Sequence, residues 1–354
     1  MKFKILTINP GSTSTKIAVF HDEQPVLEKS ISHPVKELEK FEKIWDQLAF
    51  RQNALHEFLS EHNLSPGDFS AIVGRGGLLK SVPGGTYQIN EGMIEDARIG
   101  FQGEHAANLG CALAYHLAQV AEIPAFIVDP ISVDEFEALA RYSGHPLIQR
   151  RSLSHTLNIH AVGREAAKKL GSDFEKTNFI IAHLGGGISI CPLKKGRIVD
   201  VNDASSDGPF SPERTGGLPL QPFIQLCFSG EYTAQAIKKM VMGQGGLQAY
   251  LGTNNAREVE ARIARGDTYA AEIHEAMAYQ IAKEIGAAAT VINGEVQAII
   301  LSGGLTKSGL LVNWIKERVA FIADVLVFAG EFEMQALANG ALRVLRGEEQ
   351  AKIY

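Results

Sequence analysis

The sequence is poor in cysteine, and its three cysteines, Cys111, Cys191 and Cys227, are far apart and form no CxxC pair. An odd number of scattered cysteines indicates a reducing compartment and gives no sign of a structural zinc site. No apolar run approaches about 18 residues, so we expect no membrane span and no membrane partner. The chain enters a strand-like segment at once, without a signal-peptide pattern, which predicts a cytoplasmic location.

Positive charge is scarce as well. The formal net charge is -6 over 354 residues, and a general nucleic-acid binder would need a basic face, so we expect no nucleic-acid partner. What is present is ordinary for an α/β protein, with 45% hydrophobic and 21% charged residues. The length is sufficient for two domains.

The two halves of the chain show the same order of expected elements. In the first half, strands are expected over 4–9, 15–20, from 26, over 70–73 and over 125–128, with helices over 34–62 and 104–121. In the second half, strands are expected over 179–184, 188–191, 197–201, 298–301 and 325–328, with helices over 267–291 and from 333. On the second-half helix, Ile273, Met277, Ile281 and Ile285 form one apolar stripe, which predicts core packing.

A shift of 175 residues places 5–9 on 180–184 and Gly11 on Gly186. This repetition predicts an internally duplicated chain. We expect one domain over 1–150 completed by a C-terminal helix over about 331–354, and a second over 151–330. Two similar α/β domains predict a cleft between them, where ligands usually bind.

Each half begins with a polar turn that contains glycine. The first lies in I-N-P-G-S-T-S-T-K, residues 8–16, and the second in H-L-G-G-G, residues 183–187. Such turns can expose backbone N–H groups to an anion because no Cβ blocks close approach. Neither matches the Walker pattern G-x-x-x-x-G-K-[ST]. One such turn alone is usually a plain hairpin, but two at matching places favour binding of a nucleotide triphosphate.

Seven segments occur in an order that resembles a known family: INPGSTSTK, IVGRGG, GEHAANLG, HLGGGISI, PFSPERTGGLPL, YLGTNNARE and ILSGGL. Over essentially the whole chain they resemble the butyrate kinases of the acetokinase family, which is grouped with sugar kinases and Hsp70 among the actin-like ATPases. The resemblance implies duplicated, ribonuclease H-like α/β domains, each with a mixed five-stranded sheet flanked by helices. Acetate kinases resemble the chain less, since they typically have H-G-G where Arg75-Gly76-Gly77 stands here.

The resemblance also implies a reaction, the reversible Mg²⁺-dependent transfer of the ATP γ-phosphoryl group to a short fatty carboxylate. A carboxylate is already ionised at neutral pH and needs no general base. The site must instead gather positive charge and hydrogen-bond donors around an in-line phosphoryl group. We therefore expect Arg, His and Lys side chains there and no Ser-His-Asp triad.

The site residues follow from the resemblance, motif by motif. Those expected to bind the nucleotide are Asn9, Ser12, Ser14, Lys16, His183, Gly185, Gly186, Gly187, Asn255, Arg257, Gly303 and Gly304. Those expected to take part in catalysis are Arg214, His155, Arg75 and His105. Arg214 is expected to hold the carboxylate and the phosphoryl oxygens with its planar guanidinium. His105 is expected at the start of a helix, where the helix dipole adds to its positive field. Asp129 and Glu333 resemble the carboxylates that hold Mg²⁺.

Gly74 and Pro212 are expected to line the acyl pocket. Acetate kinases have a bulky valine at the position of Gly74, so its absence is expected to leave room for two more methylenes, each contributing about 0.8 kcal/mol when buried. This favours butyrate or isobutyrate over acetate.

Three alternatives stay open. The chain resembles acetate and propionate kinases in the same way, if less closely. A non-catalytic nucleotide switch on the actin-like fold would not need Arg214 and His155, and a sugar kinase would need a base such as Asp129. The implied partners are a small carboxylate, ATP and ADP, and further copies of the chain in a homo-oligomer. His21, His33, His56 and His62 are expected to be surface or core residues without a role.

Overall fold

The computed structural model describes residues 2–330 and 332–354, and its contacts divide the chain into two compact units. Unit 1 comprises Met1–Asp134, Thr156–Asn158 and Phe332–Tyr354, and unit 2 comprises Glu135–His155 and Ile159–Glu331. The first boundary falls after Asp134, earlier than the expected position near residue 150. Residues 1 and 331, which end two of the expected ranges, lie outside the described residues.

Unit 1 is built on a seven-stranded sheet in the order β14-β5-β6-β4-β1-β2-β3. Its strands are β1 (Lys4–Pro10), β2 (Ser14–His21), β3 (Gln24–Ser32), β4 (Ala71–Arg75), β5 (Thr86–Gln88), β6 (Ala125–Val128) and β14 (Lys352–Ile353). The five strands predicted in this half are confirmed. The expectation of five strands in the sheet is wrong, because β5 pairs with β6 and β14 pairs with β5, which extends the sheet at one edge.

The helices of unit 1 are α1 (Val35–Leu38), α2 (Leu48–Glu61), α3 (Glu91–Ile99), α4 (Asn108–Val120) and α12 (Glu333–Leu345). The prediction of one continuous helix over 34–62 is wrong, because this segment forms two separate helices. It is interrupted between α1 and a 3₁₀ turn at Ile44–Gln47, where the Asp46 side chain accepts a hydrogen bond from Lys43 N at 3.1 Å and so caps a new helical start.

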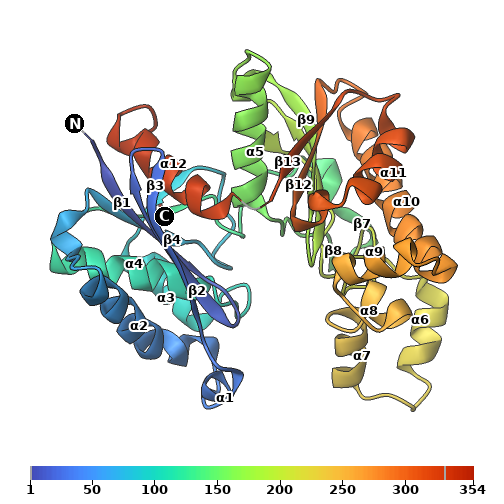
Figure 1. Cartoon of the computed structure of the whole chain (residues 1–354), viewed down its shortest axis with the longest axis horizontal. Helices are drawn as coiled ribbons and strands as arrows, with labels where there is room; N and C mark the ends of the chain where they lie inside the picture. The colour runs from blue at the N-terminus through green and yellow to red at the C-terminus, as the bar shows by residue number, and fades with distance from the viewer. Residues whose placement is uncertain (1, 331) are drawn as a thin grey trace. The chain divides into compact units, whose positions relative to one another are not determined.

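Helices α4 and α12 cover opposite faces of this sheet (Figure 1). Successive residues of a strand point to opposite faces. Gly74 of β4 faces α4, where a Cβ would lie 2.0 Å from the carbonyl oxygen of Gly110. The next residue, Arg75, forms an ion pair with Glu333 at the start of α12.

Unit 2 is built on a five-stranded sheet in the order β11-β10-β9-β12-β13, beside a separate hairpin. The sheet strands are β9 (Asn178–Leu184), β10 (Ile188–Lys194), β11 (Arg197–Ile198), β12 (Ala298–Gly303) and β13 (Val325–Ala329), and the hairpin is β7 (Tyr142–His145) and β8 (Ile148–Gln149). The helices are α5 (Thr156–Lys169), whose first turn is grouped with unit 1, α6 (Leu220–Cys227), α7 (Ala234–Val241), α8 (Gly246–Leu251), α9 (Ala256–Ala264), α10 (Thr268–Val291) and α11 (Gly309–Val319).

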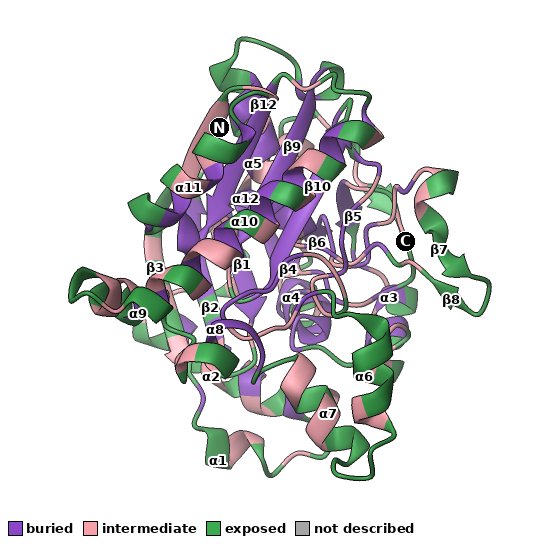
Figure 2. Ribbon diagram, turned by 90° about the vertical axis from the view of Figure 1, so that its right-hand side faces the viewer, coloured by how far each residue is buried: buried purple, intermediate pink, exposed green. Residues whose placement is uncertain are grey.

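The core of unit 2 lies between this sheet and α10. Met277, Ile281 and Ile285 are fully buried there and Ile273 packs against them, which confirms the predicted stripe. Figure 2 shows the strands of the sheet as mostly buried, whereas α6 and α7 are exposed or half-exposed. Among the described residues, every helix is too short or too polar to span a bilayer.

The two sheets share one arrangement of five strands. In β3-β2-β1-β4-β6 and in β11-β10-β9-β12-β13, the first two pairings are antiparallel and the last two are parallel. The predicted duplicated α/β fold is therefore confirmed. Each glycine-containing turn joins the same two strands of its sheet, β1 to β2 in unit 1 and β9 to β10 in unit 2.

Candidate active site

Three predicted residues of unit 1 lie at one edge of its sheet. Strands β1, β4 and β6 are parallel neighbours, with Ile8 opposite Gly74 and Arg75 opposite Val128. The carboxyl ends of parallel strands meet at one edge, which is where side chains for ligand binding usually gather in α/β folds. Asn9, Arg75 and Asp129 stand at these ends.

Glu333 joins two of these residues from the first turn of α12. Its Oε2 accepts a hydrogen bond from Asn9 Nδ2 at 2.6 Å, and its Oε1 is ion-paired with Arg75. The carboxylate also benefits from the positive end of the helix dipole. The structure therefore brings together Asn9, Arg75 and Glu333, which lie far apart in the sequence.

Asp129 is held in an unusual backbone conformation directly after β6. Its φ is +40°, a left-handed value that is uncommon outside glycine but tolerated by Asp. Its Oδ1 accepts from Gly85 N at 2.7 Å, its own N–H donates to the Gly85 carbonyl at 3.0 Å, and the residue is 5% exposed. The backbone of Gly85 thus holds this carboxylate at the edge of the sheet.

The carboxylates of Asp129 and Glu333 fit a magnesium ion by their chemistry. Mg²⁺ usually binds to proteins through one or two carboxylates and completes its shell with substrate phosphates and water. Among residues 2–330 and 332–354 no cluster of three or more His, Cys, Asp or Glu side chains could hold a metal alone. Two carboxylates are within the number that Mg²⁺ takes from the protein in sites that it shares with substrate phosphates.

The first glycine-containing turn is a tight hairpin loop between β1 and β2. Gly11 N donates to Ser14 O at 2.8 Å. Ser12 and Lys16 are exposed and Ser14 is half-buried, and Lys16 lies opposite Asn9 in the ladder. The predicted residues of this turn therefore lie next to the Asn9 cluster, on the same strand pair.

His105 differs from its expected placement at the start of a helix. Helix α4 begins at Asn108, and His105 lies in the exposed loop before it, where its Nδ1 accepts from Ala107 N at 3.1 Å. The prediction that a helix already begins at His105 is therefore wrong, and the part of His105 in catalysis stays a prediction.

In unit 2, Arg214 lies directly against the glycine turn. A Cβ on Gly187 would lie 2.5 Å from Arg214 Nη1, so a side chain at residue 187 would displace the guanidinium from its present position. The loop that carries Arg214 is bound to the turn by Ser211, whose Oγ donates to Gly186 O at 2.6 Å and accepts from Arg214 N at 3.2 Å. Gly246, with φ +58°, brings the start of α8 against the same loop.

The guanidinium of Arg214 has unused donors. Its Nη1 donates to Ala204 O at 3.1 Å, whereas its Nε is buried without a hydrogen-bond partner. Burial lowers its pKa, against the opposing effect of the Glu213 and Asp203 carboxylates. A partly desolvated cation with an unsatisfied N–H is suited to receive an anion, since buried donors left unpaired are costly.

His155 and His183 form a stacked pair beside this turn. Their ring centroids are 4.1 Å apart and their planes differ by 25°. A hydrogen bond of 3.0 Å joins His155 Nδ1 to Ser189 Oγ, and Ser189 lies opposite His183 across β9 and β10. Unit 2 thus gathers His155, His183, Gly185–Gly187 and Arg214, together with Ser189, which sequence reasoning missed.

The predicted adenosine residues do not join this cluster through any hydrogen bond in the described chain. Asn255 caps α9, with its Oδ1 accepting from Arg257 N at 3.1 Å, and both residues are exposed. Gly303 has φ +93°, and a Cβ there would lie 2.3 Å from Leu184 O, so packing alone requires this glycine. Gly304 is exposed, with open space in its side-chain direction.

The argument that Gly74 enlarges an acyl pocket is wrong. The space that its side chain would fill is occupied by the backbone of α4, with Gly110 O at 2.0 Å and Ala114 Cβ at 3.2 Å. The glycine permits close packing of a strand on a helix and opens no room. Pro212 is buried in the Arg214 loop, where its carbonyl accepts from Gln248 N at 2.9 Å.

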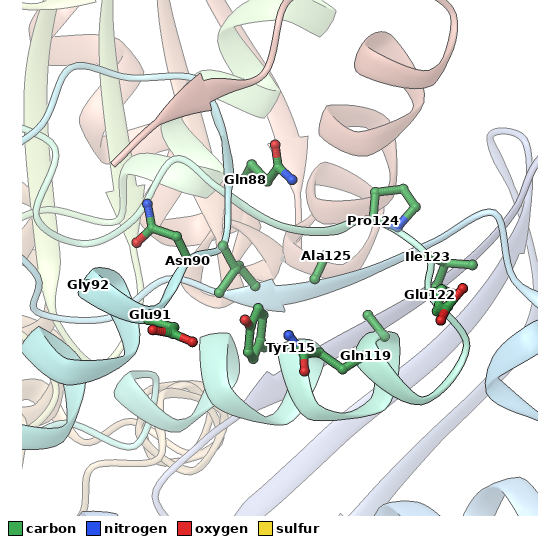
Figure 3. Close-up of a pocket in the computed structure, with 12 residues that line it drawn as sticks. Gln88, Asn90, Glu91, Gly92, Tyr115, Gln119, Glu122, Ile123, Pro124 and Ala125 are labelled. Atoms are coloured by element: carbon green, nitrogen blue, oxygen red, sulfur yellow. The ribbon is translucent and has the colours of Figure 1, made fainter.

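A pocket of about 800 Å³ lies elsewhere in unit 1 (Figure 3). Residues of β5, α3, α4 and β6 line it, including Tyr115, Gln119 and Pro124, and none is a predicted site residue. It adjoins the amino end of β6, whereas Asp129 follows the carboxyl end. We therefore assign it no part in the chemistry.

Comparison with known proteins gives two findings. A sequence model described as the acetokinase family matches residues 138–345, more than half of the chain. Among solved structures, the acetate kinase of Porphyromonas gingivalis is similar with a TM-score of 0.80 at 18% identity, covering 97% of this chain and 99% of that one.

Two further structures extend this likeness. A propionate kinase from Francisella tularensis subsp. tularensis SCHU S4 matches with a TM-score of 0.73 at 20% identity, covering 95% of this chain and 98% of that one. The glucokinase of Balamuthia mandrillaris matches with a TM-score of 0.52 at 12% identity, covering 98% and 94%. At these identities the structural likenesses establish the fold alone.

Proposed function

The chain belongs to the acetokinase family, and on this premise we propose that it transfers the γ-phosphoryl group of ATP to the carboxylate of a short-chain fatty acid. One carboxylate oxygen forms a new bond to the γ-phosphorus while the bond from that phosphorus to the β,γ-bridging oxygen breaks. The products are an acyl phosphate and ADP, and the reaction runs in both directions. The observation that carries this proposal is Arg214, a half-buried cation with an unsatisfied N–H beside Gly187.

The cations of unit 2 supply what this reaction requires. The acceptor is already ionised, so catalysis depends on placing positive charge where the two anions meet. The planar guanidinium of Arg214 matches both a carboxylate and the equatorial phosphoryl oxygens. His155, joined to Ser189 and stacked on His183, is proposed to stabilise the charge on the phosphoryl oxygens.

The residues of unit 1 hold the phosphate chain in this proposal. Ser12, Ser14 and Lys16 offer hydroxyl donors and a point charge at the first turn. Asp129 and Glu333 would hold Mg²⁺, directly or through water, and Asn9 and Arg75 fix the orientation of Glu333. When bound, Mg²⁺ neutralises charge on the nucleotide phosphates.

Butyrate or isobutyrate is the acceptor that we propose. Support comes from the seven sequence segments that resemble butyrate kinases, and not from Gly74. Acetate and propionate fit the family equally well, so they remain the alternative acceptors. Asn255, Arg257, Gly303 and Gly304 are proposed to contact the adenosine, and His105 to add positive charge near the substrates.

Acyl phosphate formation along the series from acetate to valerate tests this proposal. Acyl phosphates react with hydroxylamine, and the hydroxamate is measured by its iron complex. We expect the highest rate with butyrate or isobutyrate. A maximum at acetate or propionate would assign the chain to the alternative acceptors. Binding of ATP with no acyl phosphate from any acid would contradict the kinase and favour a nucleotide switch.

A further inference from the structure

A second arginine, Arg51 of α2, lies behind the first glycine-containing turn. It is fully buried and is the largest side chain in the described chain to be so. Its Nη1 donates to Ser14 O at 3.0 Å and to Thr15 Oγ1 at 3.1 Å. Its Nη2 donates to Ser12 O at 3.2 Å. The remaining donors, from Nε and Nη2, reach Gln47 Oε1 at 3.2 and 2.9 Å, so all five N–H groups of the guanidinium are used.

None of the four atoms that accept these five hydrogen bonds carries a charge. Within residues 2–330 and 332–354, no carboxylate forms an ion pair with Arg51. Burial lowers its pKa to about 10, so the side chain is still charged at neutral pH. A buried charge without a counter-charge is costly, and a purely structural role would be met at lower cost by a neutral side chain.

His33, which lies on the same side of the turn, does not supply a counter-charge for Arg51. His33 is joined to Thr15 Oγ1 by a hydrogen bond of 2.8 Å. Burial, followed by the positive charge of Arg51, lowers the pKa of His33 to about 4, so it is neutral at pH 7. One uncompensated positive charge therefore lies on the inner side of the turn.

The same hydrogen bonds orient the peptide groups of the turn. Ser12 O points to Arg51, and Thr13 O accepts from His33 N at 2.8 Å. The chain has no cis peptide bond among its described residues. In a trans peptide the C=O and the following N–H point in opposite directions, so the N–H of Thr13 faces away from Arg51 and the N–H of Ser14 faces away from the backbone of His33. The side of the turn that faces away from Arg51 is called its outer side, and Ser12 and Thr13 are exposed to solvent.

We propose that Arg51 is a positioning residue for nucleotide phosphates, which acts through the turn in two ways. It fixes the carbonyl groups of Ser12 and Ser14 inward, and its uncompensated charge makes the outer side of the turn electropositive. The polyphosphate of ATP is then the counter-charge that the protein itself does not supply. This inference rests on the proposed function for the identity of the ligand.

The substitution Gln47→Glu tests the charge without removing the contacts. A carboxylate at residue 47 keeps an acceptor for Nε and Nη2 of Arg51 and adds the missing counter-charge, so we expect the fold and its melting temperature to be maintained or raised. Affinity for inorganic triphosphate and for MgATP, measured by calorimetry, should fall roughly tenfold, the size expected for cancelling one charge about 10 Å from the phosphates at an effective dielectric constant of about 20. Adenosine binding should not change.

The matched control is Asn53→Asp, which adds the same negative charge on the exposed side of α2 and should leave triphosphate affinity within about twofold, since exposed charges are screened. A folded Gln47→Glu variant that binds triphosphate as tightly as the parent chain would overturn the proposal. Arg51→Lys, which keeps the charge, and Arg51→Gln, which removes it, give a second comparison. Equal triphosphate affinities in these two would overturn the proposal as well.

Because the readout is phosphate binding, it separates this inference from the kinase proposal. A parent chain that binds triphosphate but forms no acyl phosphate would contradict the kinase and leave the role of Arg51 standing. If the parent chain forms acyl phosphate and Gln47→Glu binds triphosphate as tightly as the parent chain, the kinase proposal stands and the role of Arg51 is overturned.

Discussion

At the scale of single residues, two arginines show how the same side chain serves different purposes. The guanidinium of Arg214 donates one hydrogen bond, to Ala204 O, and keeps a buried N–H without a partner in the described part of the chain. Arg51 has every donor occupied by neutral groups. The first is therefore suited to contact a ligand directly, whereas the second can act on a ligand only through its charge and through the turn that it holds.

Arg214→Ala should lower the turnover number for acyl phosphate formation by about 10²–10³-fold, the usual cost of removing one preorganised donor from developing charge. Arg214→Lys should recover little of this, because an ammonium lacks the planar fork. Arg98→Ala is the control, since Arg98 is exposed and its ion pair among the described residues is with Glu95 of its own helix. Near-normal turnover in Arg214→Ala would refute the assignment of this residue.

His33 should make stability depend on pH. Its folded pKa of about 4 lies below the ordinary value of 6.5, so the unfolded chain binds more protons between these two values. The stability contributed by neutral His33 is complete above about pH 6.5 and is lost as the pH falls toward 4.

Urea unfolding at pH 7 and pH 4.5 measures this effect. The loss of unfolding free energy between the two pH values should be smaller in His33→Gln than in the parent chain. His56→Gln, at an exposed position of α2, should retain the full loss. An unchanged loss in His33→Gln would show that the burial of His33 does not govern this pH range.

At the scale of elements, the close approach of β4 to α4 explains why residue 74 is a glycine. A Cβ at this position would collide with the backbone of α4, and backbone cannot move aside as the end of a flexible side chain can. Overpacking of this kind typically costs about 1–3 kcal/mol.

Gly74→Ala should therefore reduce the free energy of unfolding, measured by urea titration, by about 1–3 kcal/mol. Gly67→Ala is the control, because the nearest atom to its Cβ would be 3.9 Å away. A variant of Gly74 that is as stable as the parent chain but prefers a shorter acyl chain would restore the pocket interpretation.

The elements also show what the sequence can predict. β1, β2, β9 and β10 were predictable because each is a long apolar run beside a glycine-containing turn. β5 and β14 have three and two residues, too few for a periodic signal. Their pairing depends on the chain end returning to β5, which is a tertiary event.

Arg51 had a usable signal that was missed. It stands on the buried face of α2 with Leu55, Phe58 and Leu59, where the helical spacing calls for an apolar residue. A charged residue within an apolar stripe indicates a buried polar contact. What that contact holds could not be predicted, since the turn at Ser12 is 39 residues away in the chain.

At the scale of the whole molecule, the duplicated sheet places each glycine turn between equivalent strands, but the two turns have diverged. In unit 1 the turn is supported from behind by a buried arginine. In unit 2 an arginine lies against the turn itself. The duplication was visible in the sequence, whereas this difference depends on loops and helices outside the repeated strands. The predicted homo-oligomer stays a prediction, which sedimentation velocity of the chain would check.

The central claim is that this chain phosphorylates a carboxylate. Phosphorus NMR of the purified chain with MgATP and butyrate tests it most directly, because an acyl phosphate, ADP and inorganic phosphate give separate resonances. The account predicts that an acyl phosphate appears together with an equal amount of ADP, and that both form about 10²–10³-fold more slowly when Arg214 is replaced by alanine. ATP that stays intact, or that yields only ADP and inorganic phosphate with every short-chain acid from acetate to valerate, would contradict it.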